Sequence, residues 1–309
     1  MTTYLFTHES CIGHDPGPMH PESPARLKAA TKALRTPEFD RLVQKDAPKA
    51  NVDQIARIHP RDLVEQILDA VPSEGRVMVD GDTNMSPGTG EAALRGVGAL
   101  CAAVDAVSAG QADNAFCAIR PPGHHAEPSR PMGFCLFNNV VAGAEHARQT
   151  HGAERVAVVD FDVHHGNGTQ AMFWEDANLF FASTHQMPLY PGSGAESERG
   201  AHDNIVNVPL SPYSGGDAFR AGLGERILPA LRKFAPEFIF VSAGFDAHAD
   251  DPLAQLNFVE DDYAWATAEL FGVAADVCDG RLVSTLEGGY NLDALSNSVA
   301  THVRIMMET

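Results

Sequence analysis

VAVVDFDVHHGNGTQ, residues 156–170, is an apolar run that ends in two aspartates, two histidines and two glycines. Its first four residues are uncharged and mostly β-branched, which is typical of a strand buried on both faces of a parallel sheet. Alternate side chains of an extended chain share a face, so Asp160, Asp162 and His164 are expected to point the same way. Open α/β sheets bind ligands at the carboxyl ends of their strands. The stretch therefore predicts a binding site, with Asp162 and His164 on one ion.

The rest of the chain alternates strand-like apolar segments with helical ones. Further strands are expected at residues 3–8, 115–119, 179–184, 205–210, 238–246 and 282–286. Helices are expected from residue 24 to before Pro37, and at 60–71, 89–109, 139–149, 216–234, 260–277 and 291–306. Residues 9–24 and 80–88 are polar loops in this interpretation. The alternation predicts an α/β fold with a mostly parallel sheet covered on both faces, and no composition break divides residues 1–309 into domains.

Composition indicates a globular protein that does not span a membrane. The 309 residues are 44% hydrophobic and 20% charged, and no apolar stretch approaches the roughly 20 residues of a membrane span. The amino terminus shows no secretory signal pattern, so we expect a cytoplasmic protein. The formal net charge of −19 disfavours nucleic acid and anionic membranes as partners and mildly favours cationic ones, such as lysine-rich peptides or polyamines. The composition is compatible with a monomer and with a homo-oligomer.

The cysteines give no sign of a disulfide framework or of a structural zinc site. They are five in number, widely scattered and never in a CxxC pair. We expect buried thiols in a reducing compartment.

A third metal ligand is expected at the end of another buried strand. The run FIFVSAGFD, residues 238–246, ends in Asp246 as the opening stretch ends in Asp162. Two carboxylates and one imidazole would leave positions open for water or substrate, as a catalytic zinc site requires. Oxygen-rich ligation also leaves Fe²⁺ or Co²⁺ open.

Proton transfer could be performed by a second histidine pair. His124 and His125 follow a strand end and a stiff Pro-Pro-Gly turn, and Asp160 and Asn167 could each orient one ring. Tyr290, on a glycine turn that we expect to be flexible, could donate to an oxyanion. Together with a metal ion, these residues predict hydrolysis of an amide without a covalent intermediate. No nucleophile elbow or phosphate loop competes with this interpretation.

The motifs RPPGHHAE, GFCLFNN, DFDVHHGNGTQ, YPGSG, SAGFDAH and LEGGYN occur in one chain, in an order and spacing that resemble the histone deacetylase family. The similarity covers nearly the whole chain and is strongest to class II and bacterial amidohydrolase members. It implies an arginase-like, single-domain fold around an eight-stranded parallel sheet. It also implies Asp162, His164 and Asp246 as zinc ligands, His125 as general base and Tyr290 as the catalytic tyrosine.

The resemblance further implies a narrow channel for an acyl-lysine side chain. Phe134 and Tyr190 would form its walls, the carbonyl of Gly133 would accept from the substrate amide, and Asp82 would hold the substrate backbone. Structural potassium is implied as well. One ion would be held by Asp160, Asp162, His164, Ser183 and Thr184, and a second would lie near Phe173, Asp176 and Leu179.

Two positions depart from close relatives. Asn167 replaces the aspartate of class I enzymes, which should bias His125 less toward its charged form. Leu253 stands where polyamine-specific relatives carry an acidic residue, so acyl-lysine in proteins or peptides is the favoured substrate. The alternatives are an acetylpolyamine or other small amide, and a non-catalytic acyl-lysine binding module, which would not need Tyr290. A binuclear manganese ureohydrolase is weaker, because Gly166 follows the histidine pair where a second-metal carboxylate would be needed.

Overall fold

The computed structural model describes all 309 residues. Its central sheet has eight parallel strands in the order β2-β1-β5-β10-β9-β6-β7-β8. The strands are β1 (Thr3–Thr7), β2 (Val43–Asp46), β5 (Asn114–Cys117), β6 (Val156–Asp160), β7 (Leu179–Gln186), β8 (Ile205–Leu210), β9 (Phe238–Ala243) and β10 (Leu282–Leu286). A separate antiparallel hairpin consists of β3 (Val77–Asp80) and β4 (Thr83–Met85). All five residues of β6 are buried, as the uncharged run at residues 156–159 predicted for the strand.

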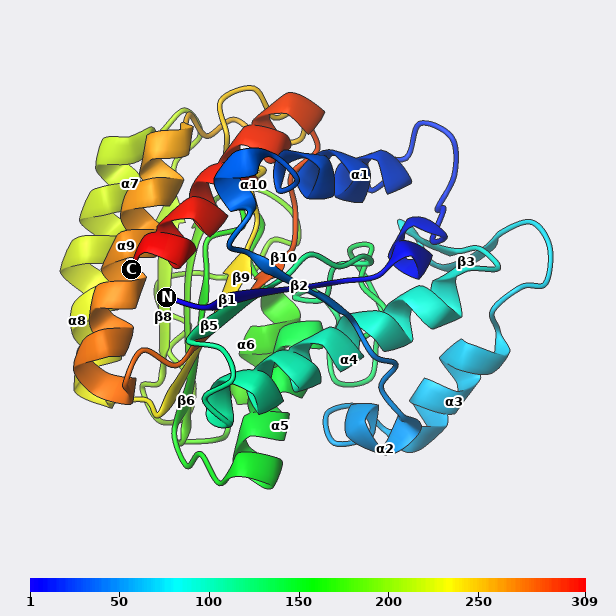
Figure 1. Cartoon of the computed structure of the whole chain (residues 1–309), viewed down its shortest axis with the longest axis horizontal. Helices are drawn as coiled ribbons and strands as arrows, with labels where there is room; N and C mark the ends of the chain where they lie inside the picture. Colours follow the sequence, from blue (N-terminus) through cyan, green and yellow to red (C-terminus); the bar gives the residue numbers. More distant parts are fainter.

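Helices cover both faces of the sheet (Figure 1). They are α1 (Pro24–Ala33), α2 (Val52–Ile55), α3 (Arg61–Asp69), α4 (Thr89–Ser108), α5 (Asn139–His151), α6 (Asn167–Phe173), α7 (Gly216–Gly222), α8 (Leu228–Phe234), α9 (Glu260–Cys278) and α10 (Leu292–Glu308). Helices α4 and α5 pack together on one face, while α1, α10, α9 and α8 follow one another across the other. The predicted class, a parallel sheet with helices on both faces, is confirmed.

Local signals explain where several helices begin and end. The side chain of Asn138 accepts a hydrogen bond from the Val141 amide at the start of α5, and Gly152 ends that helix at φ +73°. The Asn291 side chain accepts from two amides at the start of α10. The predicted helix 216–234 is continuous but contains a π-helical turn, η3 (Leu223–Ile227), between α7 and α8. None of the helices combines the length and the hydropathy that a membrane span requires.

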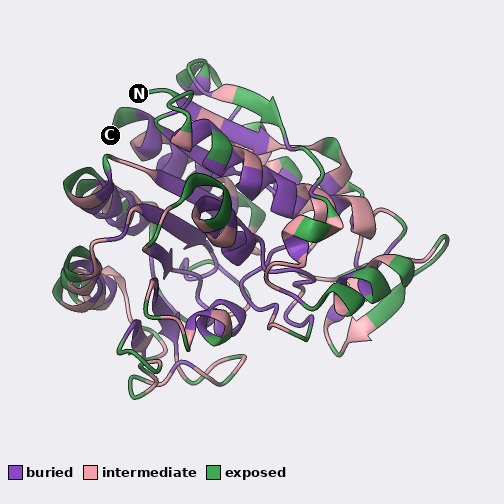
Figure 2. Cartoon of the chain, turned by 90° about the horizontal axis from the view of Figure 1, so that it is seen from below, coloured by how far each residue is buried: buried purple, intermediate pink, exposed green.

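The structure differs from the prediction at several elements, including the short helices α2 and α6, which were not expected. β2, of sequence VQKD, was missed because it is an edge strand whose last three residues are exposed, so it lacks an apolar pattern. Residues 80–88 were expected to be a loop, but Thr83–Met85 pairs with Val77–Asp80 to form the hairpin. Figure 2 shows buried strands between helices with exposed outer surfaces. In the hairpin, Val77 and Met78 of β3 are exposed, whereas Thr83 and Met85 of β4 are buried. β3 is too exposed, and β4 at three residues is too short, to show the alternation that reveals a half-buried sheet.

One buried histidine gives the fold a specific pH dependence. His302 of α10 lies fully buried between the hydroxyls of Thr267 and Ser284, at 2.6 and 2.8 Å. Burial lowers the pKa of His302 to about 3 from its ordinary value of 6.5. Below pH 6.5 the unfolded chain therefore binds a proton that the folded chain does not, and the free energy of unfolding falls as the pH drops toward 3.

We expect His302→Gln to reduce this fall by up to about 1.4 kcal/mol per pH unit, because one proton is involved. Urea unfolding between pH 7.5 and 4.5 measures the slope. The control is His202→Gln, at an exposed histidine, and it should retain the wild-type slope. An unchanged slope in His302→Gln would contradict the assignment.

Candidate metal centre and active site

The sheet register brings two loops with carboxylates together. β6 and β9 are neighbours, and Asp160 pairs with Ser242 near the carboxyl ends of both strands. The loop after β6 carries Asp162 and His164, and the loop after β9 carries Asp246. Parallel neighbours present their carboxyl ends at one edge, so residues eighty positions apart converge there.

Asp162, His164 and Asp246 form a buried cluster of three metal-ligating side chains. The Nδ1 atom of His164 lies 3.1 Å from Asp162 Oδ1 and 3.1 Å from Asp246 Oδ2. Close glycines make room for the carboxylates, because a Cβ atom at Gly244 would collide with Asp162 and one at Gly288 with Asp246. The donor set therefore fits a divalent ion with an open position.

The charge of this cluster also favours a cation. Burial would lower the pKa of His164, but Asp162 and Asp246 raise it to about 10. Two carboxylates thus draw a positive charge to the point that His164 Nδ1 faces. A metal ion would compete with a proton for that point.

The alternation argument from the sequence is wrong beyond Asp160. β6 ends at Asp160, and residues 161–166 turn rather than continue the strand. Asp160 Oδ1 accepts from the Asp162 amide at 3.0 Å, and Asp162 Oδ1 accepts from the His164 amide at 2.9 Å. Asp162 and His164 still meet because these hydrogen bonds fold the chain back on itself, as Asx-type turns do.

His124 and His125 lie beside the metal cluster with different partners. His124 Nδ1 is 2.9 Å from Asp160 Oδ2, and His125 Nδ1 is 2.8 Å from Asn167 Oδ1. Burial would lower the pKa of His124, but Asp160 and Asp162 raise it to about 10. Burial, together with the charges of His124 and His164, holds the pKa of His125 well below its ordinary value. The pair is therefore one charged and one neutral ring.

A cavity of about 230 Å³ leads to these residues. The five residues expected in a substrate channel all line it, together with His125, His164, Tyr290 and the unanticipated Leu189: Asp82, Gly133, Phe134, Tyr190 and Leu253. Gly133 has φ +58°, and a Cβ atom there would lie 2.5 Å from His125 Cδ2. Its amide donates to Asp82 Oδ1 at 3.1 Å, so Asp82 already holds one wall of the cavity.

The turn that carries Tyr290 is fixed rather than flexible. The Tyr290 amide donates to Asp251 Oδ2 at 2.7 Å. The guanidinium of Arg26 donates to the carbonyls of Glu287 and Gly289, and its Cζ lies 4.9 Å from the centre of the Tyr290 ring. The carboxylate of Glu22 forms salt bridges with both Arg26 and Arg120, and all three side chains are buried.

Sequence reasoning missed these supporting residues. Glu22 and Arg26 are spaced i,i+4 around the start of α1, and such pairs are usually exposed. Arg26 contacts residues 261 and 263 positions away, which no local pattern could reveal. Glu287 accepts from the amides of Gly123 and His124, at 2.7 and 3.2 Å, and burial raises its pKa to about 7.

Comparison with known proteins agrees with this geometry. Residues 20–306 match the model of the histone deacetylase domain. The chain belongs to the histone deacetylase family.

Relatives of this deacetylase-family chain occur in plants and bacteria. It is 40% identical over 323 residues to the chloroplastic histone deacetylase 14 of Arabidopsis thaliana, covering 98% of this chain and 76% of that protein. It is 39% identical over 312 residues to a histone deacetylase-like amidohydrolase of Pseudomonas aeruginosa, covering 94% and 82%. The crystal structure of the HDA15 HD domain superposes with a TM-score of 0.92 at 32% identity, covering 99% and 88%. The chain is accordingly an amidohydrolase that acts on acyl amides.

Two expected potassium positions differ in how well they suit a cation. At the first, the backbone carbonyls of Asp162 and His164 accept no backbone hydrogen bond, and Thr184 Oγ1 is buried without a partner. Ser183 Oγ contacts His185 Nδ1 at 2.9 Å. These free oxygens suit a cation. At the second, the Nδ2 atom of Asn204 donates to the carbonyls of Phe173, Asp176 and Leu179.

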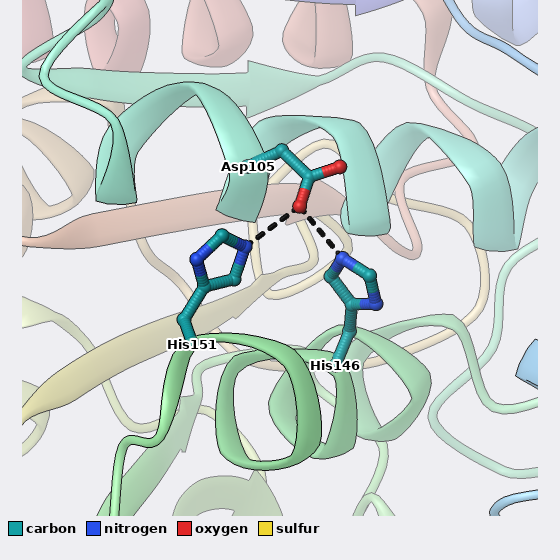
Figure 3. Close-up of side chains that lie close together, drawn as sticks. All are labelled: Asp105, His146 and His151. Atoms are coloured by element: carbon teal, nitrogen blue, oxygen red, sulfur yellow. Dashed lines mark hydrogen bonds and ion pairs between the residues drawn. The ribbon is translucent and has the colours of Figure 1, made fainter.

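A second cluster with metal-ligand chemistry lies on the surface of this deacetylase-family chain. The Oδ1 atom of Asp105, on α4, lies within hydrogen-bond distance of two histidines (Figure 3). The Nε2 atoms of His146 and His151 are both 2.7 Å from it. The Nδ1 atom of His146 lies 3.1 Å from Arg57 Nη1. Arginine only donates, so Nδ1 must accept and Nε2 must carry the proton that it gives to Asp105. A metal would need the Nε2 lone pair, so this cluster is a hydrogen-bonded contact between α4 and α5.

We expect metal to bind at the buried cluster alone. Asp246→Asn should weaken zinc binding by more than the roughly 10- to 100-fold typical of removing a group that merely orients a ligand. His151→Gln, in the surface cluster, should leave affinity unchanged. Competition against a chelator of known affinity measures both, and metal content per purified chain is the second readout. A loss of zinc in His151→Gln but not in Asp246→Asn would refute this placement.

Proposed function

We propose that this chain is a zinc-dependent deacylase that hydrolyses the side-chain amide of acyl-lysine in proteins or peptides, and that residues 1–309 act as one catalytic domain. The observation that carries the proposal is the shared cavity. The same narrow space is lined by His164 of the metal cluster, the neutral His125 and the hydroxyl-bearing Tyr290. Amide hydrolysis needs these three chemistries at one point.

The roles follow from charge and position. Zinc held by Asp162, His164 and Asp246 would polarise the substrate carbonyl and make a bound water more acidic. His125 is the proton acceptor, because its lowered pKa keeps it neutral at pH 7. His124, whose pKa is about 10, stays positively charged and supports the developing negative charge. The hydroxyl of Tyr290 donates to the carbonyl oxygen as that oxygen gains charge.

The cavity lining supports an acyl-lysine substrate. Phe134 and Tyr190 offer aromatic walls to a flexible aliphatic chain, and Leu253 adds an apolar side chain where a cationic amine would need an acid. Asp82, at the same cavity, would receive the backbone amides of a bound peptide. An acetylpolyamine or another small amide is the second candidate, favoured by the net charge of −19. One structural potassium ion at Asp160, Asp162, His164, Ser183 and Thr184 is part of the proposal.

The test is acetate release from an acetyl-lysine peptide by the purified protein, before and after a chelator and after zinc is restored. Tyr290→Phe should lower kcat at least about 10²-fold, because it removes one oxyanion donor. Iron and cobalt restoration in parallel identifies which ion supports the highest rate. An equal rate in Tyr290→Phe would mean that the chain acts without this donor, and no metal-dependent release from any acyl-lysine would overturn the proposal. Acetylputrescine as a matched substrate separates the two substrate classes by kcat/KM.

Replacing the neutral partner of the base should move the pH profile. Asn167→Asp places a carboxylate 2.8 Å from His125 Nδ1, which raises the pKa of that ring. Because the base must be neutral to accept a proton, the acidic limb of kcat/KM should shift to higher pH. Asn167→Ala, which adds no charge, is the control and should not shift upward. A downward shift in Asn167→Asp would contradict the role of His125.

A further inference from the structure

The turn between α6 and β7 has three backbone carbonyls directed at one point. These belong to Phe173, Asp176 and Leu179, and the Nδ2 atom of Asn204 lies 2.9, 3.1 and 2.7 Å from them. Asn204 is 4% exposed, so water does not compete for these contacts. A group of carbonyl oxygens facing a common centre is the environment in which proteins replace the hydration shell of an alkali cation.

Asn204 is fixed in this position by its own backbone and by a neighbouring glycine. Its carbonyl accepts from the Phe181 amide at 3.1 Å, immediately before β8 begins. Its Oδ1 accepts from the His202 amide at 3.4 Å. Gly200, at φ +72°, leaves room for that oxygen, since a Cβ atom there would collide with it. The side chain thus has its oxygen and its nitrogen assigned by separate partners.

The charges around the turn give no additional attraction to a cation. Of the two carboxylates in the turn, Glu175 is exposed to solvent, whereas Asp176 has its Oδ2 2.9 Å from Arg148 Nη1 and its Oδ1 accepts from the Asn178 amide at 2.9 Å. The guanidinium of Arg148 already neutralises this acid. A second positive charge would face the three carbonyls with no buried, unpaired carboxylate beside it.

We propose that the amide of Asn204 takes the place of a second monovalent cation in this chain, so that no ion binds between Phe173, Asp176 and Leu179. Its two N–H groups occupy the point that the three oxygens face, although the carbonyls of Phe173 and Asp176 also accept from the amides of Asp176 and Leu179, at 3.3 and 3.1 Å. The Asn204 side chain thereby anchors the end of α6, the helix whose first residue, Asn167, contacts His125. The position of α6 is therefore set by a side chain and not by the alkali ion in solution. This inference holds whatever substrate the cavity takes.

Asn204→Ala tests the idea, with Asn178→Ala in the same turn as the control. In tetramethylammonium chloride, Asn204→Ala should melt lower than the wild type by on the order of 5 °C, because three buried carbonyls lose their hydrogen bonds to the Asn204 amide. In potassium chloride of equal ionic strength it should bind one more potassium ion per chain than the wild type and recover much of that loss. Asn178→Ala should match the wild type in melting temperature and potassium content.

The wild-type chain provides a measurement that does not depend on how the variant folds. Crystals soaked in a thallium(I) salt should show no anomalous peak between the three carbonyls. Such a peak, or equal potassium content in wild type and Asn204→Ala, would overturn the proposal. A peak absent in the wild type and present in Asn204→Ala would support it fully.

Discussion

The structure depends on holding two buried carboxylates side by side. Asp162 and Asp246 are both fully buried, and burying unpaired charge costs several kcal/mol per ion. Backbone amides compensate part of this cost, because Asp162 Oδ2 accepts from Gly288 at 2.7 Å and Asp246 Oδ1 accepts from Val163 at 2.9 Å. Each bond joins loops that follow different strands. These hydrogen bonds therefore offset part of the cost of burying the two carboxylates and also fix the loops at the carboxyl edge of the sheet.

The need to compensate buried charge also explains why the adjacent His124 and His125 can differ in charge. The ring centroids of His124 and His125 are only 4.0 Å apart, so two positively charged rings would repel each other. A carboxylate behind His124 and an amide behind His125 decide which ring keeps the proton. Both partners, Asp160 and Asn167, lie in the stretch that also supplies Asp162 and His164. One segment of the chain therefore sets the geometry of the metal cluster and the protonation of its neighbours.

How far the sequence could be interpreted depended on whether the signal was local. The strand at 156–159 and the acid at 246 were visible because a buried strand carries no charge until its end. Asp162 and His164 do lie together, but not for the reason given, since the strand stops at Asp160 and a turn brings them together. β2 was invisible as an exposed edge, and Arg26 because its partners lie more than 260 positions away. Asn204 could not be found either, because its role exists only where three distant carbonyls meet.

The distribution of charge within the cavity bears on substrate choice more directly than the net charge does. Asp82 is the one acid in the lining, and its Oδ1 already accepts from the Gly133 amide and the Thr83 hydroxyl, at 3.1 and 2.9 Å. Phe134, Tyr190, Leu189 and Leu253 make the remaining wall apolar or aromatic. A free amine would exchange its hydration shell there for a single carboxylate, one of whose oxygens already accepts two hydrogen bonds. The acidic excess of the chain thus lies outside the cavity, where under the proposed function it would attract the cationic segments of a lysine-rich partner while the uncharged acyl-amide enters.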